Sequence, residues 1–271
     1  MAFKQTSLLI EPEELAPILS DKDQLIVAVC SDQVFDRGHI PGSVLVRPAE
    51  LVSGRMPGTG KLPSLENLNQ LFSKIGLTKS TRLIAYDDEG GGWAGRLCWT
   101  LDVIGHHDWA YLDGGLHAWH SAGLPLTQEA TETQPSHDLY LTIDRSPIAE
   151  MADVMASIDD NSSLVWDVRS AEEYAGLRSG SARRGHVPGA VNLDWELLKD
   201  SNRQLRLVEN LDEIAASLGL LQAERERQRK RQRKRSSPAA PPVAAPTEPA
   251  PAAPKRVAPP EAQDERGAKP P

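Results

Sequence analysis

The sequence has few cysteines and few aromatic residues, and it contains no long apolar run. Only Cys30 and Cys98 occur in 271 residues, which excludes a disulfide-rich scaffold and a zinc site built from several cysteines. No apolar run approaches the roughly 20 residues of a membrane-spanning helix. The N-terminus MAFKQTSLLIEPEEL reaches acidic residues too early for a secretory signal. We therefore expect a cytoplasmic protein with no membrane association and no metal site.

Charge is distributed unevenly along the chain. Residues 222–271 carry 12 basic and 6 acidic side chains, so their net charge is +6, whereas that of residues 1–221 is −14. The same segment holds 11 of the 21 prolines and no Leu, Ile or aromatic residue, so it has too little apolar surface to offset the entropy lost on ordering. We expect a disordered, basic, Ala/Pro-rich tail. Its cluster at 225–235 would contact nucleic acid only nonspecifically, because no aromatic residue interleaves the basic ones.

A short motif, GHxPG, occurs twice, at residues 38–42 and 185–189, an offset of 147 positions. Each copy follows a β-branched run and an aromatic residue, Phe35 in the first and Tyr174 in the second if the second copy carries an insertion. Each copy also precedes a helix-like stretch that ends in Gly-Leu. Self-similarity of this kind indicates an internal duplication.

Helix and strand patterns alternate around both motifs. In SLENLNQLFSKIGL the apolar residues share one helical face, with Ser64 as N-cap and Gly76 as the stop; ENLDEIAASLGL repeats the pattern with Gly219. A buried-type strand at 83–86 precedes a helix at 93–104. This alternation predicts α/β domains with mainly parallel sheets covered by helices. We expect domains at residues 1–127 and 137–221, with a linker at 128–136.

Four sequence features together resemble one family. They are the paired GHxPG turns and the segments YDDEGGGWAGRLCW, LDGGLHAW and VWDVRSAEEYAG. Over residues 8–221 the chain is similar to tandem-domain rhodaneses, the thiosulfate or 3-mercaptopyruvate sulfurtransferases. The resemblance implies a small anionic sulfur donor, a cysteine persulfide, and a thiol or cyanide acceptor. It implies no metal or organic cofactor.

The resemblance also implies where the nucleophile belongs. In such proteins a cysteine lies between a central strand and a helix N-terminus of the C-terminal domain, where backbone N–H groups lower the thiol pKa. The N-terminal loop carries an aspartate instead and is inactive, and Asp87 fits that position. Arg96, one helical turn further on, is expected to offset the acidic loop rather than to bind substrate. No substrate-binding residue is assigned.

The second copy departs from the family pattern. Aligning the Gly-Leu pairs at 76–77 and 219–220 places the basic cluster where the strand before the active loop is expected, and no cysteine follows Cys98. We expect an incomplete second domain, no catalytic residue in this chain, and loss of the family reaction. Apolar residues that would face the missing layer are Val165, Val168, Val191 and Leu218. A changed reading frame, or a recombined 3′ end of the gene, would produce such a switch in composition.

Other residues have a structural and a functional interpretation. Cys30 and Cys98 are expected to be buried and inert, and His39 and His186 to form turns through side-chain hydrogen bonds. The glycine-rich loop after Asp87 could bind an anion, but three acidic residues oppose this. The alternative function is a noncatalytic module in which the first domain binds a protein or an anion.

Overall fold

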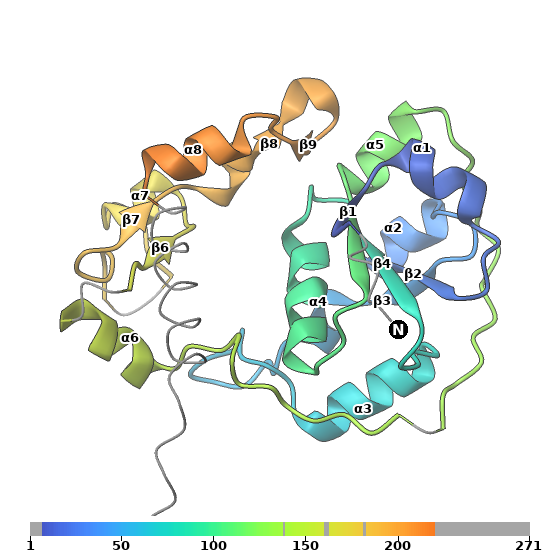
Figure 1. Ribbon diagram of the computed structural model, residues 1–271, viewed down its shortest axis with the longest axis horizontal. Coiled ribbons are helices and arrows are strands. Elements are labelled where there is room, and N and C mark those ends of the chain that lie inside the picture. Colours follow the sequence, from blue (N-terminus) through green and yellow to red (C-terminus); the bar gives the residue numbers. More distant parts are fainter. Residues whose placement is uncertain (1–6, 138, 160–162, 181–182, 220–271) are drawn as a thin grey trace, which may run out of the picture. The chain divides into compact units, whose positions relative to one another are not determined.

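The computed structural model describes residues 7–137, 139–159, 163–180 and 183–219, which belong to one unit spanning residues 1–230. The basic cluster and the Ala/Pro-rich tail expected from the sequence lie outside the described residues. The first half of the chain holds the following elements (Figure 1): β1 (Leu9–Ile10), α1 (Pro12–Leu15), η1 (Ala16–Ile18), β2 (Gln24–Val29), α2 (Asp32–Arg37), β3 (Val44–Val46), η2 (Pro48–Leu51), α3 (Leu65–Lys74), β4 (Arg82–Tyr86), α4 (Gly92–Val103), β5 (Trp109–Leu112) and α5 (Gly115–Ser121).

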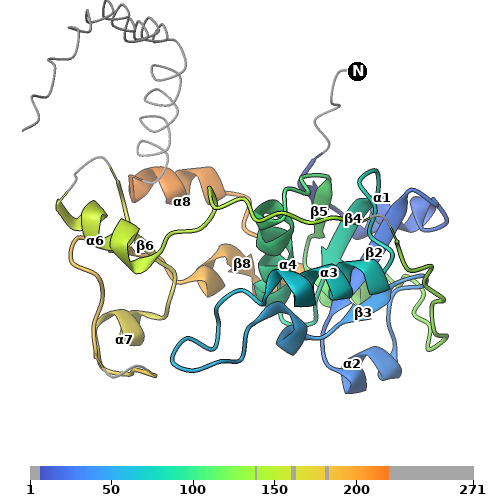
Figure 2. The same cartoon turned by 90° about the horizontal axis from the view of Figure 1, so that it is seen from below.

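A five-stranded parallel sheet organises the first half, in the order β1-β5-β4-β2-β3. Alternate side chains of β2 enter two different cores, because successive residues of a strand point to opposite faces. Val27 and Val29 join α3 and α4, whereas Ile26 and Ala28 join α1 and α5. Figures 1 and 2 show α3 and α4 together on one face of the sheet. Both faces are therefore covered, as a parallel sheet requires.

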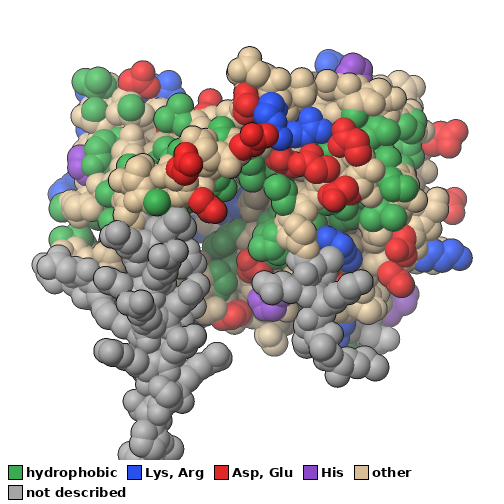
Figure 3. Space-filling view, turned by 45° about the horizontal axis from the view of Figure 1, so that its top comes forward, with side chains coloured by type: hydrophobic (Ala, Val, Ile, Leu, Met, Phe, Trp, Pro, Cys, Tyr) green, Lys and Arg blue, Asp and Glu red, His purple; other side chains and the backbone are tan. Residues whose placement is uncertain are grey.

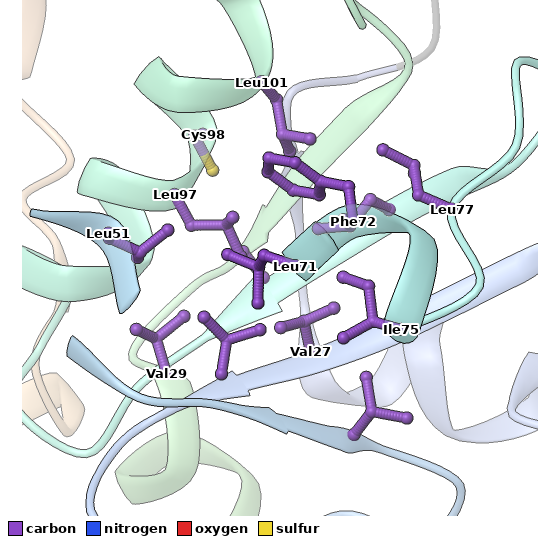
Figure 4. Close-up of a cluster of buried hydrophobic side chains, with 14 of the residues drawn as sticks. Val27, Val29, Leu51, Leu71, Phe72, Ile75, Leu77, Leu97, Cys98 and Leu101 are labelled. Carbon is purple, nitrogen blue, oxygen red and sulfur yellow. The ribbon is translucent and has the colours of Figure 1, made fainter. Parts of the chain in front are cut away.

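Residues from two helices close the larger core. Leu71 and Phe72 of α3 meet Leu97 and Leu101 of α4 above the sheet (Figure 4). The local signals in the sequence account for the placement of α3. The Ser64 hydroxyl accepts a hydrogen bond from the Asn67 N–H at 3.2 Å, and the helix ends before a glycine in the left-handed region. The predicted helix, its cap and its stop are confirmed.

The segment that leads to the second half runs along the first core. Leu139, Leu141 and Ile143 pack against that core. The Ser136 N–H donates to the Ser73 carbonyl at 2.9 Å, and the Asp144 N–H donates to the Val103 carbonyl at 2.7 Å. The described residues of this segment are thus held by the first half, although the sequence pattern assigned those from residue 137 onward to the second domain.

The second half contains short elements: α6 (Met151–Asp159), β6 (Trp166–Asp167), α7 (Ala171–Tyr174), β7 (Val191–Asn192), η3 (Trp195–Leu198), β8 (Lys199–Asp200), η4 (Ser201–Arg203), β9 (Arg206–Leu207) and α8 (Leu211–Ser217). β6 pairs with β7 in parallel, whereas β8 and β9 form an antiparallel hairpin that the sequence pattern did not indicate.

Burial differs sharply between the two halves. Among the described residues after 137, only Ala190 and Leu193 are buried apolar side chains. Of the four residues expected to face a missing layer, three are only partly buried and Val168 is 41% exposed. The described part of the second half therefore has almost no core of its own. No helix within the described ranges is long and apolar enough to span a membrane.

Candidate functional site

The loop that follows β4 is built around the side chain of Asp87, which is only 1% exposed. One carboxylate oxygen accepts hydrogen bonds from the N–H groups of Glu89 (3.2 Å) and Gly91 (2.8 Å). The other oxygen accepts from the N–H groups of Trp93 and Ala94, both at 2.9 Å. Four backbone donors thus converge on one carboxylate, in a cradle of the kind that binds anions at helix N-termini.

Glycine makes this loop geometry accessible. Gly90 and Gly91 have φ values of +84° and +107°, in the left-handed region that side chains disfavour. Gly91 is also the N-cap of α4, so the positive end of the helix dipole faces the Asp87 carboxylate. The glycine-rich sequence therefore forms an anion cradle, and the chain supplies the anion that fills it.

The LDGGLHAW segment supports the loop from the neighbouring strand. The Leu116 N–H donates to the Asp87 carbonyl at 2.9 Å. Gly115 passes so close that a Cβ atom built on it would lie 2.4 Å from the same carbonyl oxygen, and its φ is +52°. Only glycine fits at this position, which explains the second glycine of the motif.

Arg96, which was expected to offset the charge of the acidic loop, binds elsewhere. The Arg96 guanidinium donates from Nε and Nη2 to the Leu51 carbonyl at 3.2 and 3.0 Å and lies over the Trp99 ring. Lys199, 110 residues away from Glu89, instead donates from Nζ to the Glu89 carbonyl at 3.3 Å. Burial, and next the charge of Asp88, raise the pKa of Glu89. Nothing in the local sequence pointed to Lys199.

Both cysteines are buried, as the sequence predicted. Burial is the largest cause that raises the pKa of Cys30 to about 12, and the charges of Asp88 and Asp87 add to the effect. Burial likewise raises the pKa of Cys98, inside α4, to about 12. Burial therefore disfavours the thiolate form of both cysteines, whereas an activated nucleophile requires a lowered pKa.

The two GHxPG turns have the same internal structure. The Phe35 and His39 rings stack with centroids 3.6 Å apart, and Tyr174 and His186 stack at the same distance. In each turn the histidine Nδ1 lies 2.9 Å from the carbonyl oxygen of its stacked aromatic partner. The predicted equivalence of the two aromatic residues is confirmed, and both histidines stabilise turns.

Asp167 and Arg169 form an ion pair in the second half. Arg169 donates from Nε to Asp167 Oδ1 at 2.9 Å and from Nη2 to the Gly185 carbonyl at 3.0 Å. The hydrogen bond from Arg169 is the main cause that lowers the pKa of Asp167. This pair joins β6 to the second GHxPG turn. Within the described ranges, no group of three or more His, Cys, Asp or Glu residues is arranged to hold a metal ion.

The duplicated turns belong to two copies of one known domain. The Rhodanese-like domain matches the chain twice, over residues 11–122 and 150–230. The chain belongs to the rhodanese family. The two matches confirm the tandem arrangement of rhodanese-like domains that the repeated motif indicated.

Several characterised proteins resemble this rhodanese over most of its length. It is 38% identical over 218 residues to a thiosulfate sulfurtransferase of Pseudomonas aeruginosa, covering 80% of each chain. It is 37% identical over 205 residues to a thiosulfate sulfurtransferase of Azotobacter vinelandii, covering 76% of this chain and 75% of the relative. The crystal structure of the 3-mercaptopyruvate sulfotransferase SseA from Escherichia coli matches with a TM-score of 0.69 and 26% identity, covering 79% of this chain and 84% of that chain.

Proposed function

We propose that this rhodanese is a noncatalytic member of a sulfurtransferase family. The names of its relatives indicate a family reaction that moves sulfur from thiosulfate or 3-mercaptopyruvate. The resemblance to the family implies a thiol or cyanide as acceptor. The single observation that carries the proposal is that the Asp87 carboxylate fills the anion cradle. The burial of both cysteines of the chain supports it.

The reaction depends on that thiol. A thiolate attacks the outer sulfur of the donor, a new S–S bond forms, and sulfite or pyruvate leaves; the acceptor then takes the outer sulfur and restores the thiolate. The carboxylate of Asp87 cannot form a persulfide. In this proposal Asp87 and Arg96 belong to an inactive-type loop of a first domain at residues 1–127, and the second domain, at 137–221, lacks the strand and loop that would carry the nucleophile.

The cradle also bears on the alternative of anion binding. An incoming anion would have to displace the Asp87 carboxylate from four backbone donors and approach Asp88 and Glu89. The negative charges of Asp88 and Glu89 would repel the incoming anion. A noncatalytic role would therefore use another surface of the first domain.

A sulfur-transfer assay tests the proposal. With thiosulfate as donor and cyanide as acceptor, we expect the full chain to form thiocyanate at the uncatalysed rate. The Cys30→Ser, Cys98→Ser double variant should give the same rate, because neither thiol takes part. An active thiosulfate sulfurtransferase assayed alongside confirms the conditions. Turnover that exceeds the uncatalysed rate and disappears in the double variant would refute the proposal.

The gene offers a second test, of how the nucleophile came to be absent. The composition changes abruptly after Glu224, from a mixed sequence to one rich in Arg, Ala and Pro. If a change of reading frame caused this, another frame beyond that codon will encode a β-strand followed by a cysteine-containing loop. Resequencing the 3′ end from independent template and translating all forward frames checks this expectation. If no frame encodes such a segment, the basic tail is the chain's own ending.

A further inference from the structure

The second half of the chain is held by something other than its own core. Of its described residues, only Ala190 and Leu193 are buried apolar side chains, and its sheets have two strands each. A two-stranded sheet is at best marginally stable in water without further packing. Among the described residues, the contacts that stabilise this half include surfaces outside it.

The hairpin formed by β8 and β9 makes polar contacts with the first half. Arg206, whose side chain is 14% exposed, donates from Nε to Glu11 Oε2 at 2.9 Å and also pairs with Glu13 at 3.3 Å. The backbone N–H of Leu207 donates to the buried carboxylate of Asp113 at 2.8 Å. Figure 3 shows a face of the molecule on which acidic and basic side chains lie next to one another. These contacts join positions more than 90 residues apart in the sequence.

The same segment covers the glycine-rich loop. The Lys199 side chain lies against Gly90, where a Cβ atom would come within 2.9 Å of its Cδ, and its ammonium group reaches the Glu89 carbonyl. The Trp195 ring lies against Gly92, 3.1 Å from where a Cβ would be, and Lys199 Nζ lies 4.0 Å from the centroid of that ring. Because Gly90 and Gly92 have no side chain, Lys199 and Trp195 can occupy the space next to them.

The backbone of the hairpin is strained where it touches the first half. Gln204 and Leu205 have φ values of +57° and +64°, two consecutive non-glycine residues in the left-handed region. The Gln204 carbonyl lies 2.7 Å from where a Cβ on Gly114 would be, and Leu205 lies against Gly90. Strained conformations of this kind persist when surrounding contacts fix them. Here the surrounding contacts include Gly90 and Gly114 of the first half, beside the Leu205 N–H hydrogen bond to the Asp200 carbonyl at 2.9 Å within the hairpin.

We propose that the face of the first domain formed by Glu11, Glu13, Asp113 and the Asp87 loop is a docking surface for the chain's own hairpin, residues 199–207, and that this docking keeps the second half folded. The hairpin presents the basic side chain of Arg206 to the acidic side chains of Glu11 and Glu13 on this surface. The mouth of the inactive loop is consequently covered from within the chain. This inference does not depend on whether the protein transfers sulfur.

A charge reversal in the full chain tests the proposal by hydrogen exchange. Arg206→Glu places a carboxylate against Glu11 and Glu13, so we expect exchange of the Leu207 amide to accelerate by about tenfold or more. If docking keeps the second half folded, the Val191 and Leu193 amides of the distant β6–β7 pair accelerate with it. Amides of α3 and β4 should keep their protection, which shows that the first domain remains folded.

The matched control is Arg203→Glu. Arg203 lies on the same hairpin but pairs with Glu209 at 3.4 Å and with the Leu207 carbonyl at 3.2 Å, both within the second half. Arg203→Glu should accelerate hydrogen exchange of the β6–β7 amides much less than Arg206→Glu does. Equal effects of the two reversals, or protection at β6–β7 that Arg206→Glu leaves unchanged, would overturn the proposal.

Chemical cross-linking detects the docked state without relying on destabilisation. In an Arg206→Lys variant, a water-soluble carbodiimide activates the Glu11 or Glu13 carboxylate; the new amine then forms an amide and the carbodiimide leaves as a urea. We expect a cross-linked peptide that joins position 206 to position 11 or 13, and none from an Arg203→Lys variant to those positions. Failure of the Arg206→Lys chain to cross-link there while remaining folded would contradict docking.

Discussion

Asp87→Ala is expected to lower the free energy of unfolding of the first domain by about 3–5 kcal/mol, because it removes a charged acceptor from four buried or partly buried N–H groups. Those donors, on Glu89, Gly91, Trp93 and Ala94, belong to the loop before helix α4 and to its first turn, and all four bind the Asp87 carboxylate. The loss therefore combines unsatisfied hydrogen bonds with the loss of a favourable charge at a helix N-terminus. Urea denaturation of the full chain, followed by tryptophan fluorescence, measures the change.

Two further variants make this prediction specific. Asp88→Ala removes the adjacent acidic residue, but the loop N–H groups donate to Asp87 and not to Asp88. This variant should therefore change the free energy of unfolding by less than about 1 kcal/mol. Asp87→Asn preserves size and one acceptor oxygen but directs an NH₂ group at two N–H donors, so its effect should lie between those of the other two. A loss under 1 kcal/mol for Asp87→Ala would show that the cradle does not stabilise the fold.

Gly115→Ala is expected to have an effect of comparable size for a steric reason. The added Cβ would lie 2.4 Å from the Asp87 carbonyl oxygen, which is backbone and is fixed by the Leu116 N–H. The residue would also have to hold a φ of +52°. Relief requires α5 to move away from the loop, and we expect a loss of about 3 kcal/mol or more, measured by the same denaturation experiment.

Gly95→Ala is the matched control for this substitution. Gly95 lies exposed inside α4, no atom is within 4 Å of where its Cβ would be, and its φ is not positive. Alanine is a better helix former than glycine, so this variant should stabilise the protein by about 0.5–1 kcal/mol. A similar loss for both variants would mean that the clash at Gly115 is not the cause.

Features of the fold that depend on nearby residues were predicted correctly from the sequence. Periodicity and end signals placed α3 between Ser64 and Gly76, since a helix is fixed by residues within a few positions of each other. The repeated GHxPG motif predicted the equivalence of Phe35 and Tyr174, which the two ring stacks confirm. The parallel sheet followed from the alternation of strand and helix patterns.

The sequence by itself determined that the chain contains a duplicated α/β unit, that only two cysteines are present, and that Asp87 and a glycine-rich segment follow the strand at 83–86. Only the tertiary structure decided that the Asp87 carboxylate turns into its own loop, that Lys199 rather than Arg96 contacts that loop, and that the β8–β9 hairpin lies on the first domain. The contacts of Lys199 and of the hairpin join residues 110 and 94 positions apart. No pattern within a sequence window records them, because they depend on which surfaces remain complementary after each half has folded.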